Sequence, residues 1–336
     1  MYYDELSTTM DHLLQDGKGI LAADESNGTI GKRFAAINLE NTADNRQDYR
    51  LLLATTPHLG DYINGVILFE ETFQNKDTNG TSIVDLFTQQ GILPGIKVDK
   101  GLAELANTEG EQVTQGLDGL TDRLLAFKQQ GAKFAKWRNV YSISEFTPSM
   151  TAMKAGAEVL ARYAASCQAV GIVPIVEPEI LMDGNHSIEH CAEASEMVLH
   201  ELFRALFIHQ VELEHIILKP SMITCGKDVP GFSSPEDIAD YTVSVFRNTV
   251  PAAVPSINFL SGGQTPAQAT ANLNAINSTG YQPWTLSFSY GRALQEDCLA
   301  AWAGQPANVT AAQDALLNRA RLNSLACFGE YLSDMK

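Results

Sequence analysis

The sequence has no run of about 18 apolar residues, the length that a membrane-spanning helix requires. Its first residues, Met1 to Glu5, are acidic and lack the apolar core of a signal or transit peptide. Its five cysteines form neither a CxxC motif nor an even disulfide framework, so we interpret them as reduced thiols. These absences predict a cytoplasmic protein with no membrane partner.

Basic residues are also scarce. The chain carries 23 Lys and Arg against 40 Asp and Glu, for a formal net charge of -17. Nucleic-acid binding requires a basic face that neutralises phosphates, so this balance argues against a nucleic-acid partner. The same acidic field repels any small anionic ligand, which local cations would have to hold at short range.

The chain lacks an obvious internal boundary as well. No linker rich in Pro, Gly or Ser and no short-period repeat divides its 336 residues, 45% of which are hydrophobic. That length suits one large core, since α/β barrels of about 250 residues or more form single domains. We therefore expect one domain over residues 1–336, with helical extensions at its N-terminal and C-terminal ends.

Short apolar runs recur along the chain and are predicted to be eight strands. Several of these runs are apolar almost without interruption, which is typical of a parallel sheet covered on both faces. The predicted strands are 19–24, 66–72, 94–99, 132–138, 173–179, 214–220, 257–263 and 283–290.

Helical patterns separate most of these strands. In the clearest one, Thr147 is the expected cap, Pro148 the first helical residue, and Gly171 follows the end. The other predicted helices are 118–130, 188–210, 235–249 and 266–277, with 4–16 before the first strand and 293–304 and 310–331 after the last.

Eight strands that alternate with helices indicate an α/β fold of the (β/α)8 TIM-barrel type. The alternative is a doubly wound open sheet. A glycine-rich dinucleotide fingerprint would favour that alternative, but no GxGxxG motif follows the first predicted strand.

Charged residues end several of the predicted strands. Burying an unpaired charge is costly, so charges at several buried strand ends indicate one shared polar pocket. In a barrel these ends open on one face, where barrel enzymes keep their active sites. The residues concerned are Asp24, Glu25, Lys97, Asp99, Lys100, Lys136, Arg138, Glu177, Glu179 and Lys219.

Lys219 is the predicted nucleophile of this pocket. It precedes Pro220, which favours extended backbone up to the strand tip. An uncharged amine there would form a Schiff base with a ketone or aldehyde, and burial beside Lys136 would lower its pKa. The alternative is a lysine that merely extends to solvent.

The carboxylates have predicted roles in proton transfer. Glu177, with a raised pKa, would help to expel water from a carbinolamine, and Glu179 would support it from the same strand face. Asp24 would accept a proton from a substrate hydroxyl during carbon–carbon cleavage. The alternatives are an ion pair between the glutamates and Lys136 or Arg138, and a helix cap at Asp24.

Two sets of residues are predicted to bind phosphate, and two such sites beside an imine-forming lysine predict a sugar bisphosphate as substrate. Lys136 and Arg138 would polarise substrate oxygens or hold phosphate, and the alternative for them is an ion-pair network. For the two phosphate-binding sets that follow, the alternatives are ordinary turns for the first and a solvated charged loop for the second. One set follows strands seven and eight, where barrels often bind phosphate: Ser261, Gly262, Gly263, Gly291 and Arg292. The other follows strands one and three: Ser26, Thr29, Lys32, Arg33 and Lys100.

The histidines give little support for a metal. His186 and His190 have a spacing found in metal sites, and Asp183 lies nearby in the sequence, but no third ligand presents itself. We therefore expect no metal and no other cofactor.

Seven segments together resemble the class I fructose-1,6-bisphosphate aldolase family. They occur in the family's order over nearly the whole chain, and the set is far more specific than any one member. The segments are Gly19–Ser26, Gly95–Gly101, Phe134–Arg138, Pro174–Ile180, Leu218–Pro220, Phe259–Gln264 and Phe288–Leu294.

The resemblance implies a TIM barrel, usually a homotetramer, that cleaves fructose 1,6-bisphosphate reversibly and without metal in glycolysis and gluconeogenesis. The products would be dihydroxyacetone phosphate and glyceraldehyde 3-phosphate. The family's Schiff-base lysine falls on Lys219, its proton-shuttling glutamate on Glu177 and its hydroxyl base on Asp24. Lys136 matches the lysine near the imine. The phosphate sites match Ser261, Gly262, Gly291 and Arg292 on one side, and Ser26, Thr29, Arg33 and Lys100 on the other.

The sequence departs from the family at its end. Eukaryotic members often end in a tyrosine that reaches the active site, whereas the last tyrosine here is Tyr331 and the chain ends in Ser333-Asp334-Met335-Lys336. At Thr29, a threonine replaces a frequent serine but keeps the hydroxyl.

Two rival functions are weaker. A metal-dependent aldolase needs about three histidines converging on zinc, which this sequence does not supply. A non-catalytic barrel that only binds ligands would not need the complete set of matching polar residues.

Overall fold

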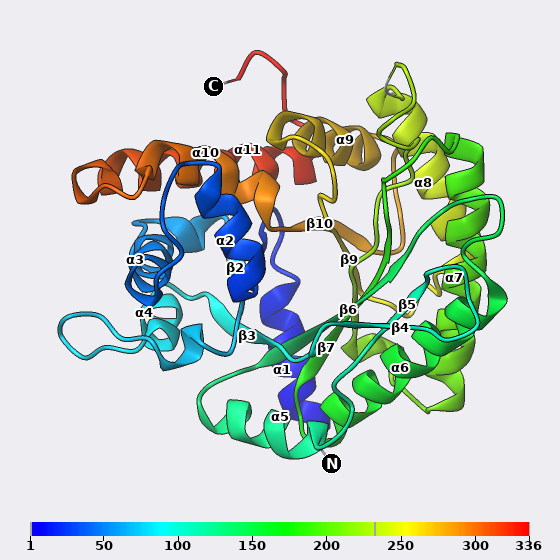
Figure 1. Cartoon of the computed structure of the whole chain (residues 1–336), viewed down its shortest axis with the longest axis horizontal. Coiled ribbons are helices and arrows are strands. Elements are labelled where there is room, and N and C mark those ends of the chain that lie inside the picture. Colours follow the sequence, from blue (N-terminus) through cyan, green and yellow to red (C-terminus); the bar gives the residue numbers. More distant parts are fainter. Residues whose placement is uncertain (1, 232, 336) are drawn as a thin grey trace.

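Eight parallel strands form a closed barrel at the centre of the molecule (Figure 1). The computed structural model describes residues 2–231 and 233–335, so the ends of the predicted domain, Met1 and Lys336, lie outside the described residues. Around the barrel the strand order is β1-β10-β9-β8-β7-β6-β3-β2, which confirms the (β/α)8 prediction. The strands are β1 Gly19–Ala23, β2 Ile63–Leu68, β3 Leu93–Lys97, β6 Phe134–Tyr141, β7 Val173–Ile180, β8 Ile217–Leu218, β9 Ser256–Phe259 and β10 Thr285–Tyr290.

Helices surround the barrel, except α1 Tyr3–Leu13, which lies at one end of it (Figure 1). The others are α2 Asn27–Ala35, α3 Ala43–Ala54, α4 Ile83–Gln89, α5 Leu120–Gln129, α6 Met150–Ala169, α7 Ile188–Ile208, α8 Pro235–Thr249, α9 Pro266–Ser278, α10 Arg292–Trp302 and α11 Val309–Cys327. Short 3-10 turns occur at Leu59–Asp61, Thr72–Gln74, Leu213–His215 and Pro306–Asn308. Among the described residues, no helix has the length and apolar character needed to cross a membrane.

Alternation along the strands divides their side chains between two cores. Leu21, Ile96 and Leu218 point outward and pack under the helices in the larger core. Ile20, Ile175 and other inward side chains form a second core, to which α1 contributes Leu6, Met10 and Leu13. The N-terminal helix thus fills the end of the barrel at which the strands begin.

The inward side chains change character along each strand. On β6 the inward positions run from Phe134 to Lys136, and on β7 they run from Ile175 to Glu177. Phe134 fills the barrel axis where Gly95 of β3 leaves room for its ring. The apolar layer below therefore supports a charged layer at the ends of the strands.

Several predicted boundaries are wrong. Helix α6 begins after Ser149, whose hydroxyl accepts a hydrogen bond from the backbone N–H of Ala152, and Thr147 does not cap it. The Thr147 hydroxyl instead donates to Ser144 Oγ. The second strand begins at Ile63 and ends at Leu68, and β8 is only two residues long because Pro220 has no N–H to extend the ladder.

The sequence reasoning missed helices α2, α3 and α4 and a small antiparallel hairpin after β3. The hairpin consists of β4 Leu102–Glu104 and β5 Gln112–Thr114. The hydroxyl of Thr114 donates to the Arg138 carbonyl, 2.6 Å away, which holds the hairpin against β6. The hairpin therefore forms a wall at the mouth of the barrel.

Candidate active site

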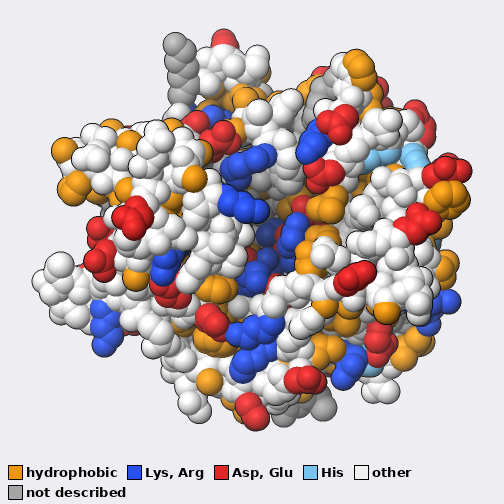
Figure 2. Space-filling model, viewed as in Figure 1, with side chains coloured by type: hydrophobic (Ala, Val, Ile, Leu, Met, Phe, Trp, Pro, Cys, Tyr) orange, Lys and Arg blue, Asp and Glu red, His pale blue; other side chains and the backbone are white. Residues whose placement is uncertain are grey.

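A cavity of about 810 Å³ opens at the ends where the strands finish. In Figure 2, Lys and Arg side chains gather in this hollow, although the molecule as a whole is acidic. The cavity receives side chains from the ends of β1, β3, β6, β7 and β10 and from the loops after β8, β9 and β10. The predicted site residues that line it are Asp24, Ser26, Thr29, Lys32, Arg33, Lys136, Arg138, Glu177, Glu179, Lys219, Ser261, Gly262, Gly263, Gly291 and Arg292.

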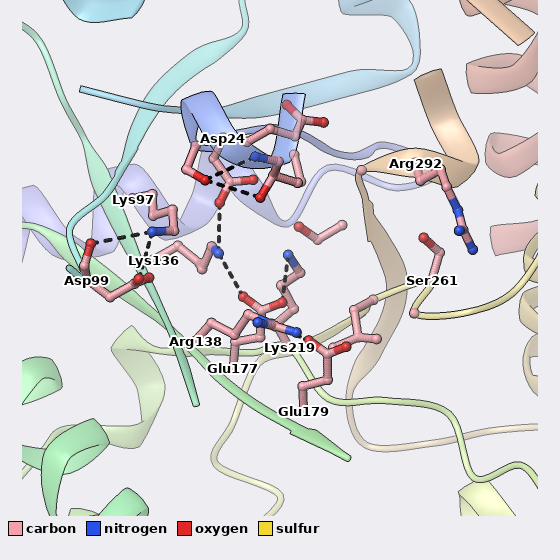
Figure 3. A pocket seen from close by; sticks show the side chains of 18 of the residues that line it. Asp24, Lys97, Asp99, Lys136, Arg138, Glu177, Glu179, Lys219, Ser261 and Arg292 are labelled. Carbon is pink, nitrogen blue, oxygen red and sulfur yellow. Dashed lines mark hydrogen bonds and ion pairs between the residues drawn. The ribbon is translucent and has the colours of Figure 1, made fainter. Parts of the chain in front are cut away.

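A chain of four charged side chains occupies the floor of the cavity. Lys136 Nζ lies 2.7 Å from Asp24 Oδ2 and 3.0 Å from Glu177 Oε2. Lys219 Nζ lies 3.2 Å from the other Glu177 oxygen, Oε1 (Figure 3). The four side chains are at most 12% exposed, so these ion pairs are shielded from water.

The backbone places these groups together. β6 pairs with β7 so that Arg138 lies opposite Glu177, and β3 pairs with β6 so that Lys97 lies opposite Lys136. The backbone N–H of Lys219 donates to the Val176 carbonyl at 2.8 Å, which fixes the lysine just beyond the end of β8. The register therefore brings these strand ends to one level, and the side chains pair diagonally across it, Lys136 with Glu177 and Arg138 with Glu179.

The ion pairs determine the protonation of this cluster. Burial raises the pKa of Asp24, but Lys136 and Lys219 outweigh it and hold that pKa well below its usual range. Burial lowers the pKa of Lys136, but Asp24 and Glu177 together raise it. Asp24 is therefore a carboxylate and Lys136 an ammonium at neutral pH.

The raised pKa predicted for Glu177 is wrong. Burial does raise the pKa of this carboxyl, but Lys136 and Lys219, one at each oxygen, lower it by more. Glu177 therefore begins as a carboxylate between two amines and can accept a proton before it donates one.

Arg138 and Glu179 form a second ion pair nearer to the opening, in which Arg138 Nε donates to Glu179 Oε2. This is the alternative that the sequence left open for Glu179. A Cβ atom at Gly262 would lie 3.0 Å from the other Glu179 oxygen, Oε1, so glycine is needed for the close approach of the loop after β9.

The loops after β9 and β10 bring two polar groups to the same side of the cavity. Figure 3 shows Ser261 beside Arg292, across the cavity from Lys97 and Asp99. Arg292 Nη2 donates to the Gln264 carbonyl at 3.2 Å, and this side chain is about half exposed. Ser261, Gly262, Gly291 and Arg292 thus converge as predicted.

Hydroxyls on the other predicted phosphate-binding loop lie at the start of α2. Ser26 caps this helix, so its oxygen accepts a hydrogen bond from the Thr29 N–H, and the two hydroxyl oxygens are 3.1 Å apart. Asp24 does not cap it. Free N–H groups at a helix start favour anions, and Lys32 and Arg33 on the same helix add positive charge.

Lys100 does not join this group. Its Nζ lies 2.6 Å from Glu70 Oε2, and Lys100 is absent from the cavity lining. The strand ends at Lys97, and it is Lys97 that lines the cavity, with its Nζ 2.6 Å from Asp99 Oδ1. The placement of Lys100 in the cavity is therefore wrong.

Five polar cavity residues were given no role from the sequence: Glu25, Lys97, Asp99, Thr114 and Ser289. Alternation could have found two of them, since Lys97 lies within the predicted strand 94–99 and Ser289 lies within the predicted strand 283–290. From the sequence, Glu25 follows Asp24 and is expected to point the opposite way. Its partners come from distant segments and leave no local pattern.

The histidine pair does not form a metal site with Asp183. The carboxylate of Asp183 pairs with Lys227. His186 is buried, and neither ring nitrogen has a hydrogen-bond partner among the described residues. Over residues 2–231 and 233–335, no three or more His, Cys, Asp or Glu side chains cluster in a way that could hold a metal ion.

The last tyrosine lies away from the cavity. The Tyr331 N–H donates to Asn274 Oδ1 of α9 at 2.8 Å, and Tyr331 lines a separate hollow between α8 and α9. This tail segment therefore packs on the outer helices.

Comparisons with known proteins agree over almost the whole chain. The family model Glycolytic, described as fructose-bisphosphate aldolase class-I, matches residues 5–336. The chain is 55% identical to a chloroplastic fructose-bisphosphate aldolase of Oryza sativa subsp. japonica, an alignment that covers 99% of this chain and 85% of the relative. It is 54% identical to the fructose-bisphosphate aldolase, cytoplasmic isozyme 2, of Pisum sativum, in an alignment that covers 98% of this chain and 92% of the relative.

A solved structure is also similar. The aldolase of Plasmodium falciparum, crystallised with TRAP and a small-molecule inhibitor, superposes with a TM-score of 0.97 at 50% sequence identity. The match covers 98% of this chain and 96% of that one.

Proposed function

The chain belongs to the family of class I fructose-bisphosphate aldolases, and on that premise we propose which of its residues cleave fructose 1,6-bisphosphate. Enzymes of this family are lyases that act without metal. The observation that carries the proposal is the buried chain of ion pairs from Lys219 through Glu177 and Lys136 to Asp24. It sets an amine, a proton carrier and a base in sequence on the floor of one cavity.

Lys219 is the nucleophile of the proposal. Its amine first gives a proton to the carboxylate of Glu177, 3.2 Å away. The uncharged amine then attacks the C2 carbonyl of the sugar, which forms a C–N bond and moves the carbonyl electron pair onto oxygen. Glu177 then returns a proton to the carbinolamine oxygen, which leaves as water and yields a protonated imine.

Asp24 is the base for cleavage. It removes the proton from the C4 hydroxyl, and the electrons of that O–H bond form the aldehyde of glyceraldehyde 3-phosphate. The C3–C4 bond breaks and its electron pair moves into the protonated imine, giving an enamine. Lys136 keeps Asp24 ionised before this step. Protonation at C3 and hydrolysis of the imine release dihydroxyacetone phosphate and restore Lys219.

The two phosphates are proposed to bind on opposite sides of this floor. Ser261, the backbone at Gly262 and Gly291, and Arg292 form one site, and Ser26, Thr29, Lys32 and Arg33 form the other. Lys97 takes the place that the sequence reasoning gave to Lys100. Arg138 and Glu179 lie between the floor and the opening. Cations at short range let an acidic protein hold an anionic sugar.

Three broader features of the sequence interpretation remain proposals. The chain is a single domain, which the closed barrel supports. It forms a homotetramer, as the family resemblance implies. It acts in the cytoplasm, as the names of the Pisum and other cytoplasmic relatives suggest, although other relatives are named chloroplastic.

The test is reductive trapping. The protein is incubated with dihydroxyacetone phosphate and borohydride, then digested, and the modified lysine is identified by mass spectrometry. We expect one stable adduct, on Lys219, and none in Lys219→Met. Lys32→Met is the matched control, because it removes a cavity lysine that the proposal does not use for the imine. An adduct on another lysine, or no adduct, would overturn the assignment.

A chelator addresses the metal-dependent rival directly. Cleavage is measured before and after dialysis against EDTA, on fructose 1,6-bisphosphate, sedoheptulose 1,7-bisphosphate and fructose 1-phosphate. We expect undiminished cleavage of the first substrate. Loss of activity that added zinc restores would reject the imine mechanism in favour of the rival.

A further inference from the structure

Glu25 forms a buried polar hub directly beside the proposed base. The residue follows Asp24 in the chain but faces the opposite way, and its side chain is 4% exposed. Its Oε1 accepts a hydrogen bond from Arg33 Nη1, and its Oε2 accepts one from Arg50 Nη2 at 2.6 Å. Burial raises the pKa of Glu25, but Arg33 and Arg50 lower it by more. One carboxylate thus holds two guanidinium groups.

Gln295 of α10 connects this hub to the barrel. Its Nε2 lies 3.0 Å from Glu25 Oε1, 2.9 Å from the Ala22 carbonyl and 3.2 Å from the Gly291 carbonyl. Ala22 is near the end of β1, and Gly291 directly follows β10. The two hydrogens of the Gln295 side-chain amide are therefore shared among three acceptors. These are a carbonyl of β1, the carbonyl that follows β10, and the carboxylate of Glu25.

The other end of the Gln295 amide is also fixed. Its Oε1 accepts a hydrogen bond from the Tyr49 hydroxyl at 3.1 Å, and Arg50 Nη1 lies 3.5 Å away. Gln295 and Tyr49 are each 1% exposed. A side chain so buried and so fully bonded holds one orientation.

Only Arg33, of the two guanidinium groups on Glu25, reaches the cavity. Its side chain is about one-fifth exposed, whereas that of Arg50 is buried. A Cβ atom at Gly291 would lie 3.7 Å from Arg33 Nη2 and 3.3 Å from the Ala22 carbonyl. Arg33, a member of the proposed phosphate site at the start of α2, therefore lies beside the loop after β10, which belongs to the other proposed site.

We propose that Gln295 is a positioning residue, which joins the ends of β1 and β10 to Glu25 and thereby fixes the guanidinium of Arg33 for substrate phosphate. Gln295 itself does not line the cavity; it acts through Glu25 and Arg33. This inference rests on the proposed function, because it assumes that Arg33 meets a phosphate of the sugar.

The first test separates substrate binding from chemistry. Gln295→Met keeps the side-chain length and removes the hydrogen bonds. We expect the KM for fructose 1,6-bisphosphate to rise about tenfold, since a hydrogen bond to a charged group contributes about that much. We expect kcat to change less than about threefold, because Lys219, Glu177 and Lys136 keep their contacts. A fall in kcat with unchanged KM would contradict the proposal.

The decisive test is a double-mutant cycle with Arg33→Ala. If Gln295 acts through Arg33, then Gln295→Met in the Arg33→Ala background raises KM by less than about twofold. If the two effects multiply, Gln295 only supports the fold and the proposal is wrong. Gln282→Met is the matched control: this buried glutamine precedes β10 at the far end of the barrel, and its effect should be below about twofold in both backgrounds.

Tyr49→Phe keeps the proposal testable if Gln295→Met does not fold. The substitution removes one of the bonds to Gln295 Oε1 and leaves the ring, so we expect a smaller rise in KM, about threefold, that disappears in the Arg33→Ala background. An equal rise in both backgrounds would overturn the proposal. Failure of the proposed function is seen separately, as absence of a Lys219 adduct in the unaltered protein.

Discussion

The floor of the cavity consists of Asp24, Lys136, Glu177 and Lys219, and its rim consists of the loops after β9 and β10 and the start of α2. Both carry charged groups, but the contacts that hold these groups differ. On the floor, Lys219 and Glu177 are each 5% exposed and are fixed by strand register and ion pairs. On the rim, Arg292 is about half exposed; it donates to the Gln264 carbonyl, and its Nε lies 3.9 Å from Glu296 Oε2. On the proposed roles, the chemistry is therefore built on buried strand ends, whereas the phosphate-binding cations differ from one another: Arg33 is held by Glu25, and Arg292 is half exposed.

Lys219→Met should break the floor most severely. Without the amine no imine forms, and we expect cleavage to fall by at least about 10⁴-fold while the bisphosphate still binds, because the rim is unchanged. Cleavage assays and calorimetric titration check the two halves of this prediction. Substantial turnover in the variant would place the nucleophile on another residue.

Lys136→Met should lower both stability and rate. It leaves the carboxylates of Asp24 and Glu177 buried without their shared cation, so we expect a loss of about 3–5 kcal/mol in the free energy of unfolding. Urea unfolding measures this loss. Lys32→Met, on the rim, is the matched control and should cost less than about 1 kcal/mol, as exposed charges do.

The loss of stability caused by Lys136→Met should depend on pH. The folded-state pKa of Asp24 lies below its unfolded value near 3.8, so its stabilising contribution is present above about pH 4 and is lost as pH falls further. The difference in unfolding free energy between the parent and Lys136→Met should therefore shrink below about pH 4. A difference that stays constant down to pH 3 would show that Asp24 and Lys136 are not coupled.

Arg292→Ala tests the rim. Removing one charged partner of a phosphate should raise the KM about tenfold or more and change kcat less, since the floor is untouched. Steady-state kinetics on fructose 1,6-bisphosphate check it. An unchanged KM would remove Arg292 from the phosphate site.

Lys100→Met should have the smallest effect. Its ammonium pairs with Glu70 outside the cavity, and exposed ion pairs contribute little. We expect KM and kcat to stay within about twofold of the parent. A rise in KM as large as that of Lys97→Met, measured in parallel, would return Lys100 to the site.

The floor of the site could be predicted from the sequence because each of its residues ends an apolar run. Lys219 after Leu218 and Glu177 after Val176 are local patterns, and alternation gives their direction. The choice between Lys97 and Lys100 could not be made in this way. It depends on where β3 leaves the barrel, which its pairing with β6 decides.

The hub around Glu25 was beyond sequence reasoning for a different reason. Its partners Arg50 and Gln295 lie 25 and 270 residues away along the chain, and neither belongs to a motif. The capping of α6 by Ser149 was missed because Thr147 and Pro148 offered an equally good local pattern. Ser149 also contacts a distant segment, since its N–H donates to Glu111 Oε1 at 2.7 Å. In both cases contacts between distant segments favour one local alternative over another.

Helix α1 closes the barrel from beneath, with Leu6, Met10 and Leu13 packed into its interior. Within the part of the chain described by the structure, the sugar therefore enters and both three-carbon products depart through the same mouth. In the proposed mechanism the aldehyde must leave before water can reach the imine that forms when C3 is protonated and hydrolyse it. In the synthetic direction the ketose phosphate must load first, since an aldehyde already lodged above Lys219 would obstruct it. Because substrates and products pass through one opening of the cavity, the order in which they bind and leave is constrained.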